Sequence, residues 1–538
     1  MIGADAIVKC LEEEGVTTLF GYPGVAICPF FNSILNTNIE PILVRSEQNA
    51  AHAASGYARI TGRPGVCVAT SGPGATNLIT GIATAYADSI PLICITGQVD
   101  SKLLGSDVFQ EADITGAAES FVKYSYLVRH VRDIPRIFKE AFHIASTGRK
   151  GPVLIDVPID IQNKTIRDFK YPDSINLRTY KPTIKGHSGQ LKKAMLEIAK
   201  SKRPVICAGG GVILSDAAGE LKAFAHKFNI PVVTTMMGIS SMSSDDKLYF
   251  GMVGNNGKAY ANRAMNESDL LIMVGARVAD RAISQPDLVT KNTSIIHIDI
   301  DPAEIGKNIG PTIPIVGDIK SIFNDLLEEN ISCDFTKWIK TLNEYKENAP
   351  LRKKPRDGFV DPALLITELS KQLKDDAVYV ADVGQNQMWS CGYYIVKSGR
   401  FLTSGGMGTM GYSLPCALGV KKACPDRQVV SVCGDGSFQM CMNELATMVQ
   451  HNIPVKLIVL TNGYLGLVRE YQANTYNRNY SVVELSGSPD ISLIAAAYGI
   501  NFTRLKDLSG LSDKIADFLA LEGAAIMECI LDPEDTVK

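Results

Sequence analysis

The sequence lacks the features of membrane-spanning, secreted and nucleic-acid-binding proteins. No apolar run approaches the roughly 20 residues that cross a bilayer, and no basic segment leads into an apolar one at the N-terminus, as in a signal peptide. The 54 Lys and Arg nearly balance the 57 Asp and Glu, so there is no positive excess to bind nucleic acid or a membrane surface. We therefore expect a complete cytoplasmic protein.

Cysteine and histidine chemistry is also sparse. The twelve cysteines form no CxxC pair and no Cys/His cluster with the spacing of a metal site. Cys67, Cys94, Cys207 and Cys433 lie in apolar runs, where a free thiol behaves as a small core residue and favours a reducing compartment. None of the seven histidines forms an evident triad with a nucleophile, and we interpret His52 as structural.

Short β-rich apolar runs alternate with amphipathic helices through most of the chain. Strands that are apolar on both faces are typical of parallel sheets covered by helices, so we expect an α/β fold with three doubly wound parallel-sheet domains. Polar, proline-containing stretches at 167–188 and 344–358 are typical of linkers, and they predict domains at 1–166, 190–343 and 359–538. The predicted strands are Val66–Thr70, Leu92–Thr96, Val153–Val157, Val205–Ala208, Leu270–Val274, Ile295–Ile300, Val378–Ala381, Val429–Cys433 and Val455–Leu460.

A candidate metal site lies in the third predicted domain. Gly434 and Gly436 flank Asp435 at the end of a predicted strand, and a second strand delivers Asn462 to the same edge, with 25 residues between Gly436 and Asn462. Ligands of α/β proteins bind at this carboxyl edge. A carboxylate, an amide oxygen and a backbone carbonyl suit Mg²⁺, whose remaining positions go to phosphate oxygens or water. The alternative is a tight turn with an incidental acid, but the second strand with its Asn favours a metal–diphosphate site.

This pattern resembles the motif of thiamine-diphosphate-dependent enzymes, in which a GDG turn is followed by a helix, a strand and NN. The resemblance implies that Asp435, Asn462 and the carbonyl of Tyr464 hold Mg²⁺ and that the cofactor is thiamine diphosphate. Thr461 replaces the first Asn of the family motif, whereas the second, taken as the ligand, is retained.

Two glycine-rich segments of the same domain also match the family. They are ADVGQNQMW at 381–389 and SGGMGTMGYSLPCALG at 404–419, and either could instead be a helix-capping loop. The resemblance implies that the carbonyl of Gly408 accepts a hydrogen bond from the aminopyrimidine and that Met410 is the apolar wedge that bends the cofactor. The other implied contacts of this cofactor are Gly384, Gln385, Asn386, Gly436 and Ser437.

Glu47 follows an apolar strand and precedes an alanine-rich helix. A Glu at a helix start is usually a capping residue. The resemblance implies instead that Glu47 hydrogen-bonds the pyrimidine nitrogen N1′, which a carboxyl group in a dry, apolar site can do while sharing a proton. The family builds each active site between two chains, with Glu47 facing Asp435 of the partner subunit, so we expect a homodimer or a homotetramer.

The whole chain resembles the catalytic large subunit of acetolactate (acetohydroxyacid) synthase. Matching stretches include TSGPGATN at 70–77, FQEADI at 109–114, GARVADR at 275–281 and HIDIDPAEIGKN at 297–308. The resemblance implies that pyruvate loses carbon dioxide and that its two-carbon unit joins a second 2-oxo acid to give 2-acetolactate, as in branched-chain amino acid biosynthesis. It places Gln110 at the reacting centre, assigns the acceptor carboxylate to Arg281 and allows a small regulatory subunit.

The middle domain resembles the FAD-carrying form of this family. A strand-end loop with an arginine suits a dinucleotide diphosphate, although a nucleotide-like domain that has lost its ligand is the alternative. The implied FAD contacts are Arg149, Gly209, Gly210, Gly211, Arg277, Asp299 and Asp318.

The sequence departs from the family where the acceptor should bind. Val25 stands where the family has a glycine, and Asn255 puts an amide in place of an apolar wall. Tyr471 replaces a tryptophan that favours 2-oxobutyrate as acceptor. One alternative is therefore a related FAD and thiamine carboligase that uses another acceptor, such as a keto-sugar or an aldehyde. A second alternative is a catalytically silent regulatory or structural partner, against which the retention of Glu47 and Asp435 argues.

Overall fold

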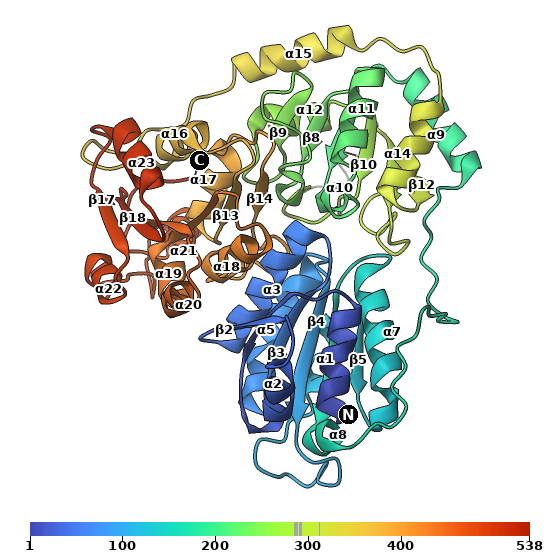
Figure 1. Cartoon of the computed structure of the whole chain (residues 1–538). Coiled ribbons are helices and arrows are strands. Elements are labelled where there is room, and N and C mark those ends of the chain that lie inside the picture. Colours follow the sequence, from blue (N-terminus) through green and yellow to red (C-terminus); the bar gives the residue numbers. More distant parts are fainter. Residues whose placement is uncertain (284–288, 290–292, 311, 538) are drawn as a thin grey trace.

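Three six-stranded sheets, each flanked by helices, make up the part of the chain that the computed structural model describes, residues 1–283, 289, 293–310 and 312–537 (Figure 1). Neighbouring strands in every sheet run parallel. The prediction of an α/β fold with three doubly wound parallel sheets is confirmed. Among the described helices, none combines the length and the apolar character that crossing a bilayer requires.

The first sheet has the order β2-β1-β3-β4-β6-β5. Its strand order reverses between β1 and β3, and ligands of such sheets bind beside the carboxyl ends of the strands at this point. The strands are β1 (Thr18–Tyr22), β2 (Glu40–Leu43), β3 (Gly65–Ala69), β4 (Leu92–Gln98), β5 (Tyr124–Leu127) and β6 (Pro152–Pro158). The helices are α1 (Gly3–Glu13), α2 (Cys28–Ile34), α3 (Glu47–Thr61), α4 (Pro73–Asn77), α5 (Ile79–Ala87), α6 (Ile114–Ala117), α7 (Ile134–Ser146) and α8 (Ile159–Asn163).

The third sheet repeats this topology with the order β14-β13-β15-β16-β18-β17. The corresponding reversal lies between β13 and β15, where the GDG turn is located. The strands are β13 (Val378–Ala381), β14 (Arg400–Leu402), β15 (Val429–Gly434), β16 (Lys456–Thr461), β17 (Asn501–Leu505) and β18 (Ala525–Ile530). The helices are α16 (Pro362–Gln372), α17 (Gln385–Tyr393), α18 (Ser413–Ala423), α19 (Asp435–Cys441), α20 (Glu444–Gln450), α21 (Gly466–Thr475), α22 (Ile491–Ala497) and α23 (Leu511–Ala520).

The middle sheet has a different order, β12-β11-β10-β7-β8-β9. Read from β9, this is the strand order of the dinucleotide-binding fold, which reverses between β7 and β10. The strands are β7 (Pro204–Ala208), β8 (Val232–Thr234), β9 (Tyr249–Met252), β10 (Leu270–Val274), β11 (Ser294–Asp299) and β12 (Ile313–Val316). The helices are α9 (Ser188–Lys200), α10 (Gly210–Leu214), α11 (Ala218–Phe228), α12 (Ala259–Asn266), α14 (Ile319–Glu328) and α15 (Thr336–Glu347).

The nine strands predicted from the sequence all form, within two residues of their expected ends. The predicted linker at 167–188 contains no regular element before α9 begins at Ser188. The predicted linker at 344–358 begins too early, because α15 continues through Glu347 and buries Trp338 and Leu342 against the middle domain. The boundaries of the three domains as folding units remain a prediction.

The first and third domains share one hydrophobic core, in which α3 packs against α18. Glycines allow the two helix backbones to approach closely. A Cβ atom on Gly56 would lie 2.1 Å from the carbonyl oxygen of Cys416, and one on Gly419 would lie 1.8 Å from that of Ala53. His52 lies in this core, fully buried, with its ring edge-on to Tyr412. Its burial lowers its pKa to about 3, so it is neutral at physiological pH.

All twelve cysteines are free thiols. Cys67, Cys94, Cys207 and Cys433, which the sequence placed in the core, are buried, whereas Cys28 is exposed.

Candidate active site

Asp435 is the first residue of α19, directly after β15, and it is buried. The backbone N–H of Gly463 donates to its Oδ2 at 2.7 Å, and that of Gly436 donates to its Oδ1 at 2.9 Å. Burial raises the pKa of Asp435 to about 6, although these N–H donors oppose the change. A divalent cation at this carboxylate would favour its ionised form.

Asn462 directly follows β16, the strand paired with β15, so it lies at the same sheet edge as Asp435. The N–H of Tyr464 donates to its Oδ1 at 3.0 Å, and its Nδ2 donates to Oε1 of Gln385 at 3.1 Å. Among the described residues, no group of three or more His, Cys, Asp or Glu could hold a metal. A cation here would rely on one carboxylate, an amide oxygen, a main-chain carbonyl and cofactor phosphates, a set that suits Mg²⁺.

The Gly384–Asn386 segment supplies the beginning of α17 at the neighbouring strand end. Gly384 has φ +128°, a conformation that favours glycine, and precedes the helix. The N–H groups at the start of a helix have no intrahelical partner and can bind an anion. Asn386 is buried, and its Oδ1 has no hydrogen-bond partner in the described part of the chain. An unpartnered buried oxygen of this kind fits a site that a ligand or water completes.

The loop that carries Gly408 and Met410 is anchored by Asp382, which sequence reasoning missed. Asp382 is fully buried at the end of β13 and accepts hydrogen bonds from the N–H groups of Gly411 at 2.9 Å and Ser413 at 2.7 Å. Burial raises its pKa. An acid directly after a core strand was the available signal for this role.

Met410 lies close to the GDG turn: a Cβ atom on Gly436 would be 3.6 Å from Cε of Met410. Gly408 is exposed with φ +69°, and its carbonyl belongs to the same loop. Ser437 is buried, and its hydroxyl bonds the N–H and the carbonyl of Gly434 at 3.1 Å. The third domain thus gathers its predicted metal and cofactor residues at one sheet edge.

Glu47 and Gln110 both lie beside the SGPG loop (residues 71–74) of the first domain. Glu47 is the first residue of α3, is half-buried and accepts a hydrogen bond from Nδ2 of Asn77 at 3.0 Å. A Cβ atom on Gly74 would lie 3.4 Å from Oε1 of Glu47, and one on Gly72 would lie 2.9 Å from Cβ of Gln110. Gln110 itself has φ +59°. The loop therefore brings a carboxylate and an amide to the same strand edge.

No hydrogen bond within the described chain joins Glu47 to the Asp435 site. The start of α3 is attached to the third domain elsewhere, at Glu444, another residue that sequence reasoning missed. Oε1 of Glu444 accepts from the N–H of Arg45 at 2.8 Å and from Nδ2 of Asn49 at 2.9 Å. Glu47 itself is therefore not bonded to Asp435 or Asn462 within one subunit, although the hydroxyl of Thr409, between Gly408 and Met410, bonds that of Thr84 in the first domain at 2.7 Å.

The strand-order reversal of the middle sheet is lined by glycines. A Cβ atom on Gly209 would lie 2.3 Å from the carbonyl oxygen of Gly275, and a Cβ atom on Gly211 would lie 2.7 Å from Cα of Gly275. Gly210, between them, begins α10. Arg277 follows on the β10 side, and its main-chain carbonyl accepts from the N–H of Ala279 at 2.9 Å. Its guanidinium has no hydrogen bond or ion pair with another described residue, so it is available to an anion.

The three remaining residues expected at FAD have protein partners. Asp299 is buried, which raises its pKa to about 6, and it accepts a bond from the N–H of Asp301. Asp318 caps α14 and accepts from the hydroxyl of Ser215 at 2.6 Å. Arg149 reaches across from the first domain to Asp301 at 3.2 Å and Glu304 at 3.0 Å.

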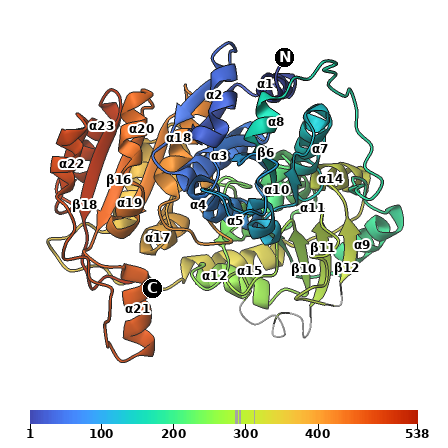
Figure 2. The same cartoon turned by 90° about the horizontal axis from the view of Figure 1, so that it is seen from below.

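The residues expected to bind the acceptor lie at the surface of the chain. Arg281 has 80% of its side chain exposed, and the N–H of Asn255 donates to its carbonyl at 3.0 Å. Tyr471 is exposed on α21, a helix with no buried residue that stands away from the body of the molecule (Figure 2). Val25 is also exposed. The structure thus places Asn255 beside Arg281, whereas Val25 and Tyr471 lie on other elements.

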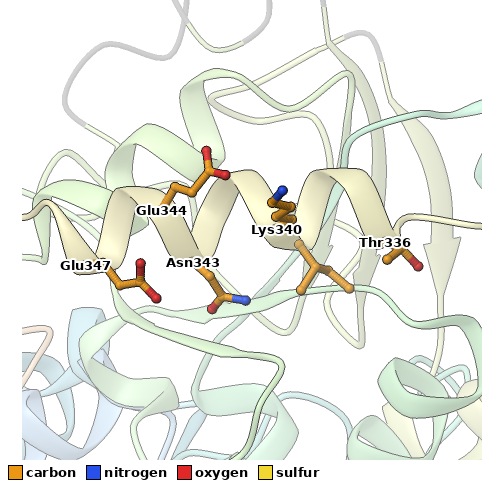
Figure 3. A pocket seen from close by; sticks show the side chains of 6 residues that line it. Thr336, Lys340, Asn343, Glu344 and Glu347 are labelled. Carbon is orange, nitrogen blue, oxygen red and sulfur yellow. The ribbon is translucent and has the colours of Figure 1, made fainter.

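A shallow hollow on the outer face of α15 is unrelated to these strand ends (Figure 3). It is open, and one helix provides its whole lining: Thr336, Ile339, Lys340, Asn343, Glu344 and Glu347.

Comparisons with known proteins agree with this geometry. Models of thiamine pyrophosphate enzymes match the chain as an N-terminal TPP binding domain at 1–117, a central domain at 191–326 and a C-terminal TPP binding domain at 382–529. A probable acetolactate synthase large subunit from Methanocaldococcus jannaschii is 44% identical, covering 100% of this chain and 93% of the relative. Acetolactate synthase large subunits from Haemophilus influenzae and Lactococcus lactis are 41% and 42% identical, covering 97% and 95% of this chain and 93% and 90% of the relatives.

Proposed function

Because the chain belongs to the thiamine pyrophosphate enzymes, in the family of acetolactate synthase large subunits, we propose that it condenses pyruvate with a second 2-oxo acid. With pyruvate as both substrates, the product is 2-acetolactate and one carbon dioxide is released. The observation that carries this function is that Asp435 and Asn462 directly follow the paired strands β15 and β16, in a sheet that matches the TPP binding domain over 382–529.

Thiamine diphosphate, when bound, supplies the electron sink on which a 2-oxo acid loses carbon dioxide. The oxygens of Asp435, Asn462 and Tyr464 would hold Mg²⁺, and the N–H groups that begin α17 would bind the diphosphate. Met410 would pack against the cofactor. Glu47 would hold a proton at the pyrimidine ring.

We propose that the active unit contains at least two chains, with Glu47 facing Asp435 of the partner subunit. The exposure of apolar side chains beside the site supports this arrangement. Met407 and Met440 are 44% and 62% exposed. Met440 adjoins Gly411, in the loop that carries Gly408 and Met410, which we call the cofactor loop. The relatives are named large subunits, so a small regulatory partner is also proposed. The twelve free thiols fit a reducing, cytoplasmic location.

FAD is proposed for the middle domain. Its strand order, the glycine contacts at the reversal and the unpartnered Arg277 support a dinucleotide there. The absorbance spectrum of the protein purified without added flavin tests this proposal, because bound FAD absorbs visible light and is released on denaturation.

Gln110 and Arg281 are proposed to contact the substrates. Arg281 would bind the acceptor carboxylate through a charge-assisted hydrogen bond. A keto-sugar or aldehyde acceptor is not favoured, since the relatives reported above are acetolactate synthases. A catalytically silent role is not favoured for the same reason. The changes at Val25, Asn255 and Tyr471 then bear on the choice among 2-oxo acids.

Product analysis tests the proposed function. The purified protein, supplied with Mg²⁺ and thiamine diphosphate, should form acetolactate from pyruvate alone, and added 2-oxobutyrate should compete as acceptor. Consumption of pyruvate without acetolactate, or product only in the presence of a sugar or aldehyde, would contradict the proposal.

A further inference from the structure

The side chain of Gln385 points toward Asn462 and lies between it and Glu470. Its Oε1 accepts a hydrogen bond from Nδ2 of Asn462 at 3.1 Å. Its Nε2 donates to Oε2 of Glu470 at 3.0 Å and to the main-chain carbonyl of Asp535 at 3.1 Å. Both ends of this buried amide are therefore used within the protein, and only its backbone N–H remains for a diphosphate.

The orientation of the Asn462 amide decides whether this residue can bind a metal. An amide offers an oxygen acceptor on one side and an N–H₂ donor on the other, and only the oxygen is a ligand for Mg²⁺. Gln385 accepts from the nitrogen, while the N–H of Tyr464 occupies one lone pair of the oxygen. The second lone pair of that oxygen remains for a cation at Asp435.

Gln385 is in turn held in one orientation. Both acceptors of its Nε2, the Glu470 carboxylate and the Asp535 carbonyl, would oppose its oxygen if the amide rotated by half a turn. Glu470 also accepts from the N–H of Val537 at 3.1 Å. The C-terminal segment is thus joined to the metal site through Glu470 and Gln385.

The contact between Gln385 and Asn462 is enclosed by the start of α21. A Cβ atom on Gly466 would lie 2.0 Å from Oε1 of Gln385 and 2.8 Å from Nδ2 of Asn462. Glycine at this position leaves room for the two amides and for nothing larger.

We propose that Gln385 is a positioning residue that presents the oxygen of Asn462, rather than its nitrogen, to Mg²⁺. The inference rests on the proposed function, because it assumes that Asp435 and Asn462 hold the cation. Partners of metal ligands commonly set metal affinity in this way, and their loss costs about 10- to 100-fold.

The test is a double-mutant cycle in the full-length protein, read as Mg²⁺ affinity by calorimetry at saturating thiamine diphosphate. Gln385→Met removes the acceptor at similar size and should weaken Mg²⁺ binding about tenfold. In the Asn462→Asp variant both terminal atoms of the side chain at 462 are oxygens, so its orientation no longer matters. There Gln385→Met should weaken Mg²⁺ binding less than about threefold. Ca²⁺ tolerates irregular geometry better than Mg²⁺, so Gln385→Met should also reduce the preference for Mg²⁺ over Ca²⁺.

Gln387→Met is the matched control. Gln387 is buried two residues further along α17, but its amide bonds Thr403 and Ser404 instead of Asn462, so the Mg²⁺/Ca²⁺ preference should not change. Glu470→Ala is a milder variant in case Gln385→Met does not fold, and it should weaken Mg²⁺ binding about fivefold, the effect of one hydrogen bond.

Two results would overturn the inference. One is an unchanged Mg²⁺ affinity and selectivity in Gln385→Met, or in Glu470→Ala if the first variant is unfolded. The other is an equal loss in the Asn462→Asp background, which would show that Gln385 does not act through the amide. Failure of the wild-type protein to bind thiamine diphosphate with Mg²⁺ would instead refute the proposed function itself.

Discussion

Replacement of Asp156 by Asn should stabilise the protein, and increasingly so as the pH rises. Asp156, on β6, is 1% exposed and accepts from the hydroxyl of Thr96 at 2.7 Å and from Nε2 of Gln98 at 2.9 Å. Gln98 also donates to the carbonyl of Ala112, two residues beyond Gln110. Asparagine can accept from Gln98 and donate to Thr96, so it keeps this network without a charge to bury.

The size of the effect follows from the pKa of Asp156, which burial raises to about 7. In the unfolded chain an aspartate ionises near pH 4, so between about pH 4 and 7 the folded state binds one more proton. The contribution of Asp156 to the free energy of unfolding is therefore greatest below pH 4. It falls as the pH rises, until the folded carboxyl is ionised above pH 7. At about 1.4 kcal/mol for each pH unit in this window, the full loss is on the order of 4 kcal/mol.

Thermal unfolding of wild type and Asp156→Asn at pH 5 and pH 8 measures this difference. The advantage of the variant should grow by several degrees between the two pH values. Asp160→Asn is a control of opposite sign, since bonds from Lys164 and Ser101 outweigh burial and leave the pKa of Asp160 below its usual range. The reasoning is refuted if Asp156→Asn shifts the midpoint equally at both pH values.

Three further predictions concern the site and its support. Glu47→Gln should lower acetolactate formation at least about 100-fold while calorimetry still detects thiamine diphosphate; unchanged carbon dioxide release would exclude the proposed role. Gly419→Ala would place a methyl group against the carbonyl of Ala53, so it should lower the free energy of unfolding, measured with denaturant, by about 1–3 kcal/mol. Gly219→Ala, in open space on α11, should not. Equal effects of the two changes would contradict the close contact between α3 and α18. Tyr471→Trp should raise the share of product formed from 2-oxobutyrate when both acceptors compete, and a constant product ratio would argue against a role in acceptor choice.

Strand positions and the sheet edge shared by Asp435 and Asn462 could be predicted because both depend on local patterns. Apolar runs bounded by turns identified β10 and β13 at their observed ends. The carboxyl ends of parallel strands meet at one edge, so the strand-end positions of Asp435 and Asn462 predicted their proximity. The α15 helix was partly missed because its charged residues resemble a linker, although Trp338 and Leu342 pack against the middle domain.

The amino-acid sequence alone determined the α/β class, the three parallel sheets and which candidate functional residues lie at strand ends, since periodicity and strand-end residues are properties of short segments. Only the tertiary structure decided which way the Gln385 amide points, that Asp382 anchors the cofactor loop and that α3 packs on α18 through Gly56 and Gly419. These features depend on partners 29 to more than 350 residues away in the chain. Sheet order and domain packing bring such partners together, so no local pattern records them.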